Sequence, residues 1–444
     1  MKIMLLADHY PPVYLGGGET HVESLAASLH EKGHKVLVFT LASTGLPNFE
    51  RKNGISIYRF DGLFQRASFL FRNPSAKLHP PIRDPFIMKR LKVIIERERP
   101  HVVHAHSSGG WIMCSALPLK EKLGIPVVVT LHNYGLLCPI LTLTKDGKQC
   151  QNVLTNNCVR CGVRVYGGKS FPVYLFLRLN KSRLKRVDKF IAISQYQKSV
   201  FARQAGLNET GIVVIPNSVD CEKFSLSNSA NEKTKKELDK LGLNHCAKKI
   251  VHISSLNANK LSSIKGIINA APKIVEKFPH TQILVVGDGG LFNDVARLAR
   301  RVNQRLRKQV IIMTGFVKND DMPKIMSFAD IVIGVGRAAL EAMACGKPVV
   351  IAGTSIGPLG GNYGGVVTKC NVEELSAHNF SGRNSFEKTT PEKIAQDCME
   401  LLEDEEYRSS LGIFGRKYVE QEHDIRKAVQ KLEDVYYDVT TRSK

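Results

Sequence analysis

The stretch Gly336–Val350, G-R-A-A-L-E-A-M-A-C-G-K-P-V-V, decides the fold of this chain. An apolar run at Ile331–Ile333 comes just before it and predicts a buried parallel strand. A turn that opens with Gly334 then leads into a helix, which we expect to begin near Ala338. A glycine and a proline end this helix, and a second apolar run, Val349–Ile351, follows. The stretch therefore predicts one tight strand–turn–helix–strand unit.

The turn of this unit predicts a phosphate-binding site. Gly334 and Gly336 let backbone N–H groups and the N-terminus of the helix point at whatever lies above the sheet. Glu341 lies one turn into the helix, where a carboxylate can accept hydrogen bonds from ribose hydroxyls. The alternative is a tightly packed βαβ unit with a surface glutamate, and the spacing alone leaves both interpretations open.

Strands and helices alternate along the first half of the chain. Helices are predicted at Glu19–Lys32 and Ile87–Arg97, between strands, which is typical of a doubly wound parallel sheet. The predicted strands of this half are Lys2–Leu6, Lys35–Thr40, Val102–Ala105, Ile125–Leu131, Phe190–Ile193 and Val213–Ile215.

A polar stretch, Asp220–Ala247, with a short helix predicted near Glu232–Leu241, separates this half from a second alternating region. We therefore predict an α/β fold with two Rossmann-like doubly wound domains, 1–215 and 216–412, and a C-terminal helix over 413–444 that crosses back to the first domain. Open α/β sheets bind ligands at the carboxyl ends of their strands, so two sheets facing across a cleft can enclose two substrates. The further predicted strands are Lys249–Ser254, Gln282–Val286, Val310–Met313, Ile331–Ile333 and Val349–Ile351, and the predicted tail helices are Pro391–Glu403, Glu406–Leu411 and the segment from Lys417 onward.

Polar residues gather where strands of the first half are expected to end. A loop of three glycines, Gly16–Gly18, follows the first strand, but its spacing is not G-x-G-x-x-G, so a dinucleotide cofactor is not expected. His132 comes directly after the strand Ile125–Leu131, where a polar side chain faces the ligand; a structural, hydrogen-bonded histidine is the alternative. His21, at the start of the first helix, is a weaker candidate for the same site.

Four cysteines lie in the loop 138–161 that follows. Their spacing, C-x11-C-x7-C-x2-C, suits a structural zinc ion in a long polar loop that needs a constraint, and a disulfide or free thiols are the alternatives. No catalytic metal is expected there, because four cysteine ligands leave no open position. The four are Cys138, Cys150, Cys158 and Cys161.

The composition limits the class of protein. The chain has 444 residues, 43% of them hydrophobic, but no run reaches the about 18 apolar residues that a membrane-spanning helix needs. Met1–Leu6 is predicted to be a first strand and not a signal peptide, because Asp8 and Pro11 end the apolar run after only a few residues. Six of the ten cysteines are scattered singly, which favours a reducing cytosol.

The net charge of +22 favours an anionic partner such as lipid headgroups or a nucleotide, while no nucleic-acid motif is present. The excess clusters at Lys181–Lys189 and Arg297–Lys308, and a solvated helix face is the alternative for each cluster. Phe64, Phe69–Phe71 and Tyr174–Leu179 adjoin basic residues, a mixture that fits docking on an anionic membrane; a core helix is the alternative for Tyr174–Leu179.

Four segments, in this order along the chain, resemble those of retaining glycosyltransferases of the family 4 type, which have the GT-B fold: H-V-V-H-A-H-S, L-H-N-Y-G-L-L-C-P, V-V-G-D-G-G and G-R-A-A-L-E-A-M-A-C-G-K-P-V-V. The resemblance extends over nearly the whole chain. It implies transfer of a sugar, with retention of configuration and without a catalytic metal, from a nucleoside-diphosphate sugar to the hydroxyl of a glycan or lipid-linked acceptor. It also implies a cytoplasmic enzyme, at most peripheral to the inner face of a membrane.

The resemblance also implies roles for individual residues. Catalytic roles fall to His132, which would contact the donor sugar, to Lys260, which would neutralise the donor diphosphate, and to Glu341; Lys265 competes with Lys260 for its role. His104 and His106, with His21, would lie on the acceptor side. Similar cysteine-bearing loops occur in a subset of the family. The donor-binding residues would be Gly17, Gly18, Ser255, Lys260, Gly287, Gly289, Gly334, Gly336, Arg337, Ala338, Leu340 and Glu341.

This chain departs from the family pattern at two positions. The family usually has an arginine where Ser255 stands, and a glutamate eight positions before Glu341, where this chain has Ile333. Arg337, on the glycine turn, can take over the lost cationic role. The departures favour a changed donor or, as rival interpretations, a catalytically weak or silent relative that binds nucleotide or glycan. A sugar-nucleotide epimerase is a further rival, although no carboxylate pair is placed for proton abstraction.

Overall fold

The computed structural model describes residues 1–13, 16–66, 83–107, 111–145, 148–225, 242–244, 246–257, 260–353 and 361–442. The helix predicted near Glu232–Leu241 lies outside these residues, as does the apolar segment Phe69–Phe71.

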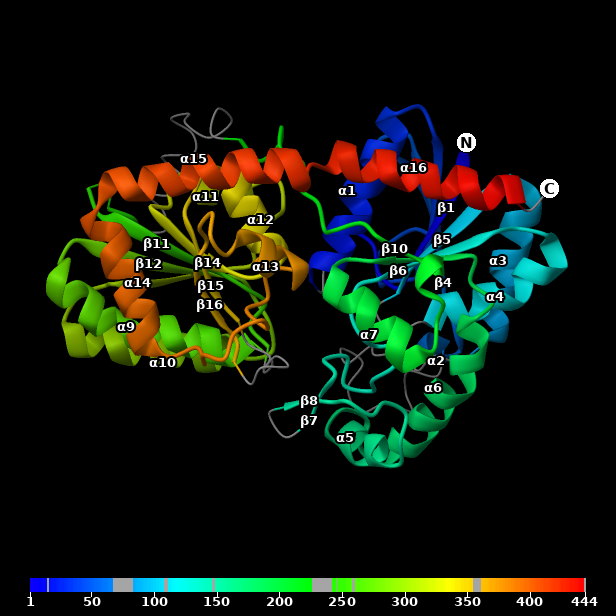
Figure 1. Cartoon of the computed structure of the whole chain (residues 1–444), viewed down its shortest axis with the longest axis horizontal. Helices are drawn as coiled ribbons and strands as arrows, with labels where there is room; N and C mark the ends of the chain where they lie inside the picture. Colours follow the sequence, from blue (N-terminus) through cyan, green and yellow to red (C-terminus); the bar gives the residue numbers. More distant parts are fainter. Residues whose placement is uncertain are drawn as a thin grey trace. The chain divides into compact units, whose positions relative to one another are not determined.

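The chain divides into two compact units, each with its own sheet (Figure 1). The first unit comprises Met1–Lys145, Cys150–Pro216 and Arg426–Lys444, and the second consists mainly of Asn217–Ile425. Both sheets are flanked by helices on their two faces, so the predicted α/β class with two doubly wound sheets is confirmed.

The sheet of the first unit has eight strands among the described residues, in the order β10-β9-β6-β5-β1-β2-β4-β3. All neighbours pair in parallel except β3, which runs antiparallel to β4 at the edge. The central strands are apolar on both faces and fully buried, as expected for strands covered by helices on both sides. The strands are β1 Lys2–Ala7, β2 Lys35–Leu41, β3 Phe49–Lys52, β4 Ile55–Phe60, β5 Val102–Ser107, β6 Val127–Leu131, β9 Lys189–Ala192 and β10 Ile212–Val214.

The helices of the first unit begin where the local sequence supplies a start signal. Asp84 accepts hydrogen bonds from the N–H groups of Phe86 and Ile87, which caps α3, and a proline occupies its first turn. The glycine loop that we predicted at Gly16–Gly18 is shorter than expected, because α1 already begins at Gly17. The helices are α1 Gly17–Glu31, α2 Leu63–Arg66, α3 Pro85–Glu98, α4 Trp111–Leu123, α5 Asn157–Tyr166, α6 Ser170–Leu184, α7 Gln195–Ala205 and α16 Ile425–Arg442, with 3₁₀ turns η2 Gly167–Lys169 and η3 Glu209–Gly211.

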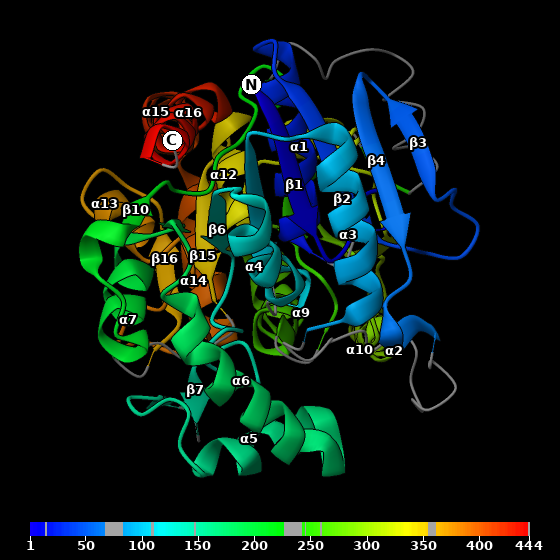
Figure 2. The ribbon, with the colours of Figure 1, turned by 90° about the vertical axis from the view of Figure 1, so that its right-hand side faces the viewer.

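Helices α5 and α6 form an excursion between β6 and β9. Figure 2 shows them at the lower end of the first unit, near β7 (Thr144–Lys145), which pairs with β8 (Lys148–Gln149). Leu154, which precedes α5, packs with Val173 and Leu177 of α6 in a small apolar cluster that connects the two parts of this insertion.

The sheet of the second unit has six strands among the described residues, in the order β13-β12-β11-β14-β15-β16. Only β16 is antiparallel, to β15. The strands are β11 Lys248–Ile253, β12 Thr281–Val286, β13 Ile311–Gly315, β14 Ile331–Gly334, β15 Val349–Ala352 and β16 Tyr363–Val366. The helices are α9 Leu261–Lys277, α10 Phe292–Leu306, α11 Met322–Ser327, α12 Arg337–Ala344, α13 Val372–Ala377, α14 Pro391–Glu403 and α15 Glu405–Glu422.

The helical tail breaks at a different place from the one predicted. The sequence predicted a break between Leu411 and Lys417, but α15 runs through this segment, including Gly412 and Gly415. A Cβ atom at Gly412 would lie 2.1 Å from the carbonyl oxygen of Gly346, so this glycine permits close packing on the end of α12. The break lies instead at Asp424, which is held by backbone hydrogen bonds of Val219 with His423 and Ile425.

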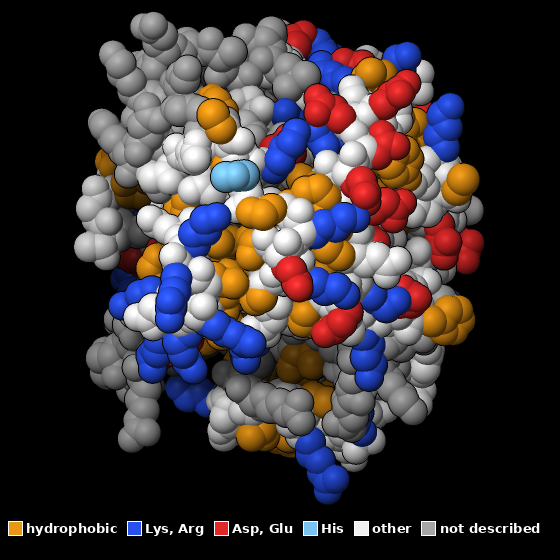
Figure 3. Space-filling view, turned by 90° about the vertical axis from the view of Figure 1, so that its left-hand side faces the viewer, with side chains coloured by type: hydrophobic (Ala, Val, Ile, Leu, Met, Phe, Trp, Pro, Cys, Tyr) orange, Lys and Arg blue, Asp and Glu red, His pale blue; other side chains and the backbone are white. Residues whose placement is uncertain are grey.

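Basic side chains are prominent on one face of the second unit. Figure 3 shows Lys and Arg gathered toward one side of this face and Asp and Glu toward the other. The arginines of the predicted basic run, including Arg297, Arg300 and Arg301, are exposed along α10, so they form a solvated helix face. No helix within the described residues is long and apolar enough to cross a bilayer.

Candidate functional site

The glycine turn of the second unit connects β14 to α12 with only two residues between them. Gly336 has φ +57°, a conformation that side-chain-bearing residues rarely adopt, and its N–H donates to the carbonyl oxygen of Phe380 at 3.0 Å. Gly334 allows close packing, because a Cβ atom there would lie 3.2 Å from that of Ala338. The side chain of Leu340 is fully buried, so only its backbone can face a ligand.

Arg337 and Glu341 contact each other on the first turns of α12. Nε of Arg337 donates to Oε1 of Glu341 at 2.6 Å, and the glutamate is only 6% exposed. Burial raises the pKa of the Glu341 carboxyl, while the charge and hydrogen bond of Arg337 act against this. The two residues that the sequence assigned to ribose and diphosphate therefore form one buried ion pair at the helix start.

The missing glutamate of the family pattern has a structural explanation. Counting eight positions back from Glu341 leads to Ile333, which is fully buried in β14 and pairs with His252 and Val350. A glutamate at this position would therefore have to place its charge in the core of the second sheet.

A cationic group lies at the start of α9. Burial lowers the pKa of the Lys260 ammonium, and the positive charge of Arg383 lowers it further. Lys265, the competing candidate, is exposed one turn into α9, which favours Lys260 for contact with a buried anion. Arg383 lies in the segment Asn379–Ser385, N-F-S-G-R-N-S, whose unusual polarity predicts additional contacts with a ligand, although the arginine itself was not named as a site residue.

The second glycine turn packs on the loop that contains Ser255. A Cβ atom at Gly287 would lie 1.9 Å from the carbonyl oxygen of Ser254, and one at Gly289 would lie 2.6 Å from that of Leu256. Both glycines have positive φ, so the turn after β12 needs them to approach the loop after β11. Ser255 and the two glycines therefore belong to one neighbourhood at the carboxyl ends of β11 and β12.

Four histidines form a cluster in the first unit. His104 and His106 come from β5, His132 follows β6 directly, and His21 lies on α1. Nδ1 of His106 and Nε2 of His132 are 3.1 Å apart, and the ring centroid of His21 is 5.1 Å from that of His132 and 5.7 Å from that of His106. The candidates predicted separately for acceptor and donor are therefore neighbours.

Both ring nitrogens of His104 have hydrogen-bond partners. Nδ1 lies 2.6 Å from Oη of Tyr436 on α16, and Nε2 lies 2.7 Å from Oγ1 of Thr130 on β6. The ring packs on that of His106, with centroids 4.2 Å apart. His104 therefore supports the cluster and has no ring nitrogen left for a ligand.

Burial keeps the imidazoles of His104, His106 and His132 neutral. It lowers the pKa of His104 to about 3 and that of His132 to about 4, and it lowers the pKa of His106 well below its ordinary value. The neighbouring histidines lower the pKa of His104 and His106 further. A cluster of neutral imidazoles can donate to and accept from hydroxyl groups, which suits a sugar better than an anion.

Asp8 is a candidate that the sequence analysis missed. It follows β1 directly, and burial raises the pKa of its carboxyl to about 7, against a backbone hydrogen bond from Ile112 and with support from the charge of Glu19. The available signal was an acidic residue at the end of the first strand, just before the glycine loop. Such a carboxyl group can exchange a proton near neutral pH.

The ten cysteines all lie in the described part of the chain, and none of them forms a disulfide there. Burial raises the pKa of Cys138 to about 11, and Cys158 and Cys150 contribute to the shift, so these three lie near one another. Within the described residues, the group of His, Cys, Asp or Glu with ligand atoms within 4.8 Å of one another is His21, His106 and His132. Zinc binding by Cys138, Cys150, Cys158 and Cys161 stays a prediction.

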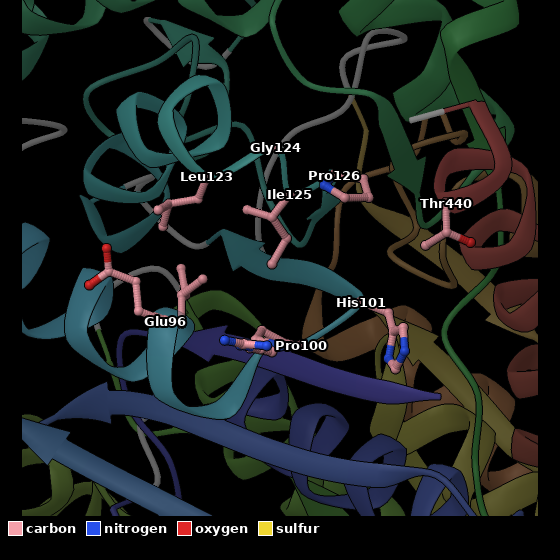
Figure 4. A pocket seen from close by; sticks show the side chains of 10 residues that line it. Glu96, Pro100, His101, Leu123, Gly124, Ile125, Pro126 and Thr440 are labelled. Atoms are coloured by element: carbon pink, nitrogen blue, oxygen red, sulfur yellow. The ribbon is translucent and has the colours of Figure 1, made fainter. Parts of the chain in front are cut away.

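An open pocket of about 540 Å³ lies at the amino ends of two strands of the first sheet, at the opposite end from the histidine cluster. Pro100 and His101 precede β5, and Ile125 and Pro126 precede β6, so the pocket faces the amino ends of these strands (Figure 4). Glu96 and Thr440 line it from α3 and α16. Because ligands of open α/β sheets bind at the carboxyl ends, we do not assign the substrates to this pocket.

Family models match both parts of the chain. Residues 15–223 match the model of Glycosyltransferase Family 4, and residues 247–404 match the model of Glycosyl transferases group 1. The chain belongs to the group 1 glycosyltransferases of the family 4 type. It is an enzyme of the glycosyltransferase class.

Two curated relatives match most or nearly all of this glycosyltransferase. N-acetyl-alpha-D-glucosaminyl L-malate synthase of Bacillus anthracis is 25% identical over 99% of this chain and 98% of its own length. The phosphatidylinositol N-acetylglucosaminyltransferase GPI3 subunit of Saccharomyces cerevisiae is 24% identical over 79% of this chain and 67% of its own.

Solved structures show that the fold is GT-B. A glycosyltransferase from Rickettsia africae has a TM-score of 0.67 at 18% identity and covers 99% of this chain and 98% of its own. Anabaena HepE in complex with UDP and glucose has a TM-score of 0.64 at 18% identity and covers 99% of this chain and 100% of its own.

Proposed function

We propose that this glycosyltransferase transfers a sugar from a nucleoside-diphosphate sugar to an acceptor hydroxyl, with retention of configuration and without a catalytic metal. The acceptor would be a glycan or a lipid-linked sugar of a cell-surface biosynthetic route. The observation that carries the proposal is the half-buried cation of the second unit, where Lys260 lies within the electrostatic influence of Arg383. Two neighbouring cations are stabilised by an anion between them, and a diphosphate supplies one.

The glycine turn gives the donor a second point of attachment. The N-terminus of α12 favours negative charge, and Arg337 lies on its first turn. Arg337, Lys260 and Arg383 would together stabilise the leaving diphosphate, and the buried carboxylate of Glu341 would accept hydrogen bonds from the ribose. The structures of Anabaena HepE with UDP and with UDP-glucose support a uridine nucleotide as the first donor to try.

The histidine cluster would bind the uncharged part of the reaction. His132 would contact the donor sugar, as the family resemblance implies, and His21 and His106 would contact the acceptor. Asp8, with its pKa near 7, is available to take the proton of the acceptor hydroxyl.

The first experiment is a donor assay without acceptor. Purified protein is incubated with UDP-, GDP- and ADP-sugars, and release of the nucleoside diphosphate is compared for wild type, Glu341→Gln and the exposed control Glu276→Gln. We expect one sugar nucleotide to be hydrolysed slowly by wild type and Glu276→Gln, and about 10–100-fold more slowly by Glu341→Gln, since a charge-assisted hydrogen bond contributes about 1.5–3 kcal/mol.

Each rival function gives another result in this assay. Binding of sugar nucleotides without hydrolysis or transfer would support a silent relative, and formation of an epimeric sugar nucleotide would support an epimerase. If no sugar nucleotide binds or reacts, the proposal is wrong.

The surface of α6 supports a membrane-proximal acceptor. Phe171, Leu175 and Leu179 follow one another at helical spacing and are 58%, 41% and 51% exposed, whereas Val173 and Leu177 on the opposite side are buried. The prediction that this segment is either a core helix or a docking helix was too simple, because α6 has one face for each. Basic residues such as Arg178 and Lys181 adjoin the exposed stripe, which fits contact with anionic headgroups at the inner face of a membrane.

Vesicle sedimentation tests this contact. We expect binding to vesicles that contain anionic phosphatidylglycerol and little binding to neutral phosphatidylcholine. The double variant Phe171→Ser/Leu175→Ser should lose most of the binding, whereas Phe386→Ser, which changes an exposed phenylalanine of the second unit, should not. Equal binding by all three proteins would contradict a role for α6.

A further inference from the structure

We propose that His21, His106 and His132 form a binding site for a divalent transition metal ion, with zinc as the best match. One ligand atom from each ring lies within 4.8 Å of the other two. Tetrahedral zinc with Zn–N bonds of about 2.0–2.1 Å brings its ligand nitrogens to within about 3.4 Å of one another. Side-chain movements of about an ångström therefore suffice to close the site.

His106 has the strongest reason to accept a metal ion. It is 5% exposed, and its Nδ1 is 3.1 Å from Nε2 of His132, which already approximates the separation of two zinc ligands. A metal ion bound by these two nitrogens would take the place of the hydrogen bond between them.

The three ligands come from a rigid frame. His106 lies on β5, His132 follows β6, and these neighbouring strands are paired in register from Val103 with Val127 to Ser107 with Leu131. His104 packs on His106 and is itself fixed between Tyr436 and Thr130. A frame of this kind holds ligands in place before the metal arrives, as the neighbours of ligands do in known metal sites.

The donor set selects the kind of metal. Three imidazoles without a carboxylate or thiolate suit zinc, copper, nickel or cobalt, and do not suit magnesium or calcium, which prefer oxygen. Three protein ligands leave a fourth position open on a tetrahedral ion. The open position would accept water or an oxygen of a small ligand.

The effect on activity follows only if the proposed function holds. In that function the same histidines bind sugar hydroxyls, so metal and substrate exclude each other and the metal acts as a reversible inhibitor. Metal binding itself does not depend on the proposed function, so its measurement stands even if no sugar transfer is found.

Cobalt(II) titration of the full chain tests the site directly. We expect one equivalent of cobalt to produce the visible absorption of a tetrahedral ion, without the near-ultraviolet charge-transfer absorption of thiolate ligands that the cysteine loop would produce. Zinc should displace the cobalt. His106→Ala and His132→Gln should each weaken binding about 100-fold or more, since even loss of an outer-shell partner costs 10–100-fold.

His101→Asn is the matched control, because this histidine lies at the amino end of the same strand β5, away from the cluster. Its affinity for cobalt should equal that of wild type. If a variant fails to fold, protection of the wild-type histidines from diethylpyrocarbonate by one equivalent of zinc provides the second measurement.

Three results would overturn the proposal: no tetrahedral spectrum with wild type, a spectrum with thiolate absorption only, or equal binding by wild type and His106→Ala. An enzyme that transfers sugar and binds no metal would retain the proposed function and lose this inference. Metal binding without any donor turnover would support this inference and contradict the proposed function.

Discussion

The two units place different chemistry at the carboxyl ends of their sheets. The first unit contributes a cluster of imidazoles that burial keeps neutral, whereas the second contributes Lys260, Arg383 and the ion pair of Arg337 with Glu341. Neutral donors and acceptors suit hydroxyl groups, and paired cations suit a diphosphate. The contrast indicates that the same type of sheet is specialised for the uncharged substrate in one unit and for the charged one in the other.

We expect the largest effect from a carboxylate at position 333, where the family pattern has its first glutamate. Ile333→Glu puts an unpaired charge into the middle strand of the second sheet, where the side chain is fully buried. We expect a loss of about 3–5 kcal/mol in the free energy of unfolding, measured by urea denaturation.

The matched change Ile333→Val removes one methylene group at the same place and should cost only about 1 kcal/mol. If Ile333→Glu were as stable as wild type and bound a sugar nucleotide more tightly, the conclusion that this position cannot hold a glutamate would be wrong.

His252, a buried histidine of the second unit, tests whether burial keeps imidazoles neutral only in the first unit. His252 on β11 is 1% exposed, its Nε2 contacts Oγ of Ser263 at 2.9 Å, and burial, assisted by the charge of Lys260, lowers its pKa from 6.5 to about 4. The unfolded chain therefore binds the proton more tightly than the folded chain between pH 6.5 and 4, so acid favours unfolding. At pH 5 the cost is about 2 kcal/mol relative to pH 7.

His252→Gln keeps a donor for Ser263 but does not titrate, so its free energy of unfolding should depend less on pH by that amount. The measurement is urea unfolding of both proteins at pH 7 and pH 5. Parallel pH dependence of the two proteins would show that His252 does not titrate in this way.

The smallest effect concerns the backbone of the glycine turn. Gly336→Ala must adopt φ near +57°, while its new Cβ atom meets only ordinary contacts at 3.7 Å with Asn379. We expect a loss of about 1–2 kcal/mol in stability, from the cost of the left-handed conformation. Gly16→Ala, at a glycine with extended φ and open space around it, is the control and should be nearly neutral. Equal thermal midpoints for wild type and Gly336→Ala would show that the turn tolerates a side chain.

Much of the fold could be predicted because its central strands are short apolar runs between helices. The strand around Ile331–Ile333 and the helix Pro391–Glu403 were predicted within one residue, and α/β class and family membership are confirmed. The strands β3, β4 and β16 were not predicted; β3 and β16 lie at the edges of their sheets and are short, with few apolar residues, whereas β4 lies between β2 and β3 and was overlooked. The tail break was misplaced, because a glycine that permits close packing resembles one that ends a helix.

The candidate site was less predictable than the fold. Motifs identified Lys260, Arg337 and Glu341 one by one, but their pairing depends on helix geometry and on burial. Arg383 and Asp8 carry no motif, and only the three-dimensional arrangement connects them with a site. Proximity of His21 to His106 and His132 likewise depends on the packing of α1 against the sheet.

Binding of nucleoside diphosphates to matched lysine variants tests the central claim most directly. UDP, GDP and ADP are titrated by calorimetry into wild type, Lys260→Ala and Lys265→Ala, the last a control with the same change at an exposed position of the same helix. We predict that at least one nucleotide binds wild type and Lys265→Ala equally and binds Lys260→Ala about 10–100-fold more weakly, the loss of one charge-assisted contact. Equal affinity in all three proteins, or no binding of any nucleotide to wild type, would contradict the assignment of the charged substrate to the second unit.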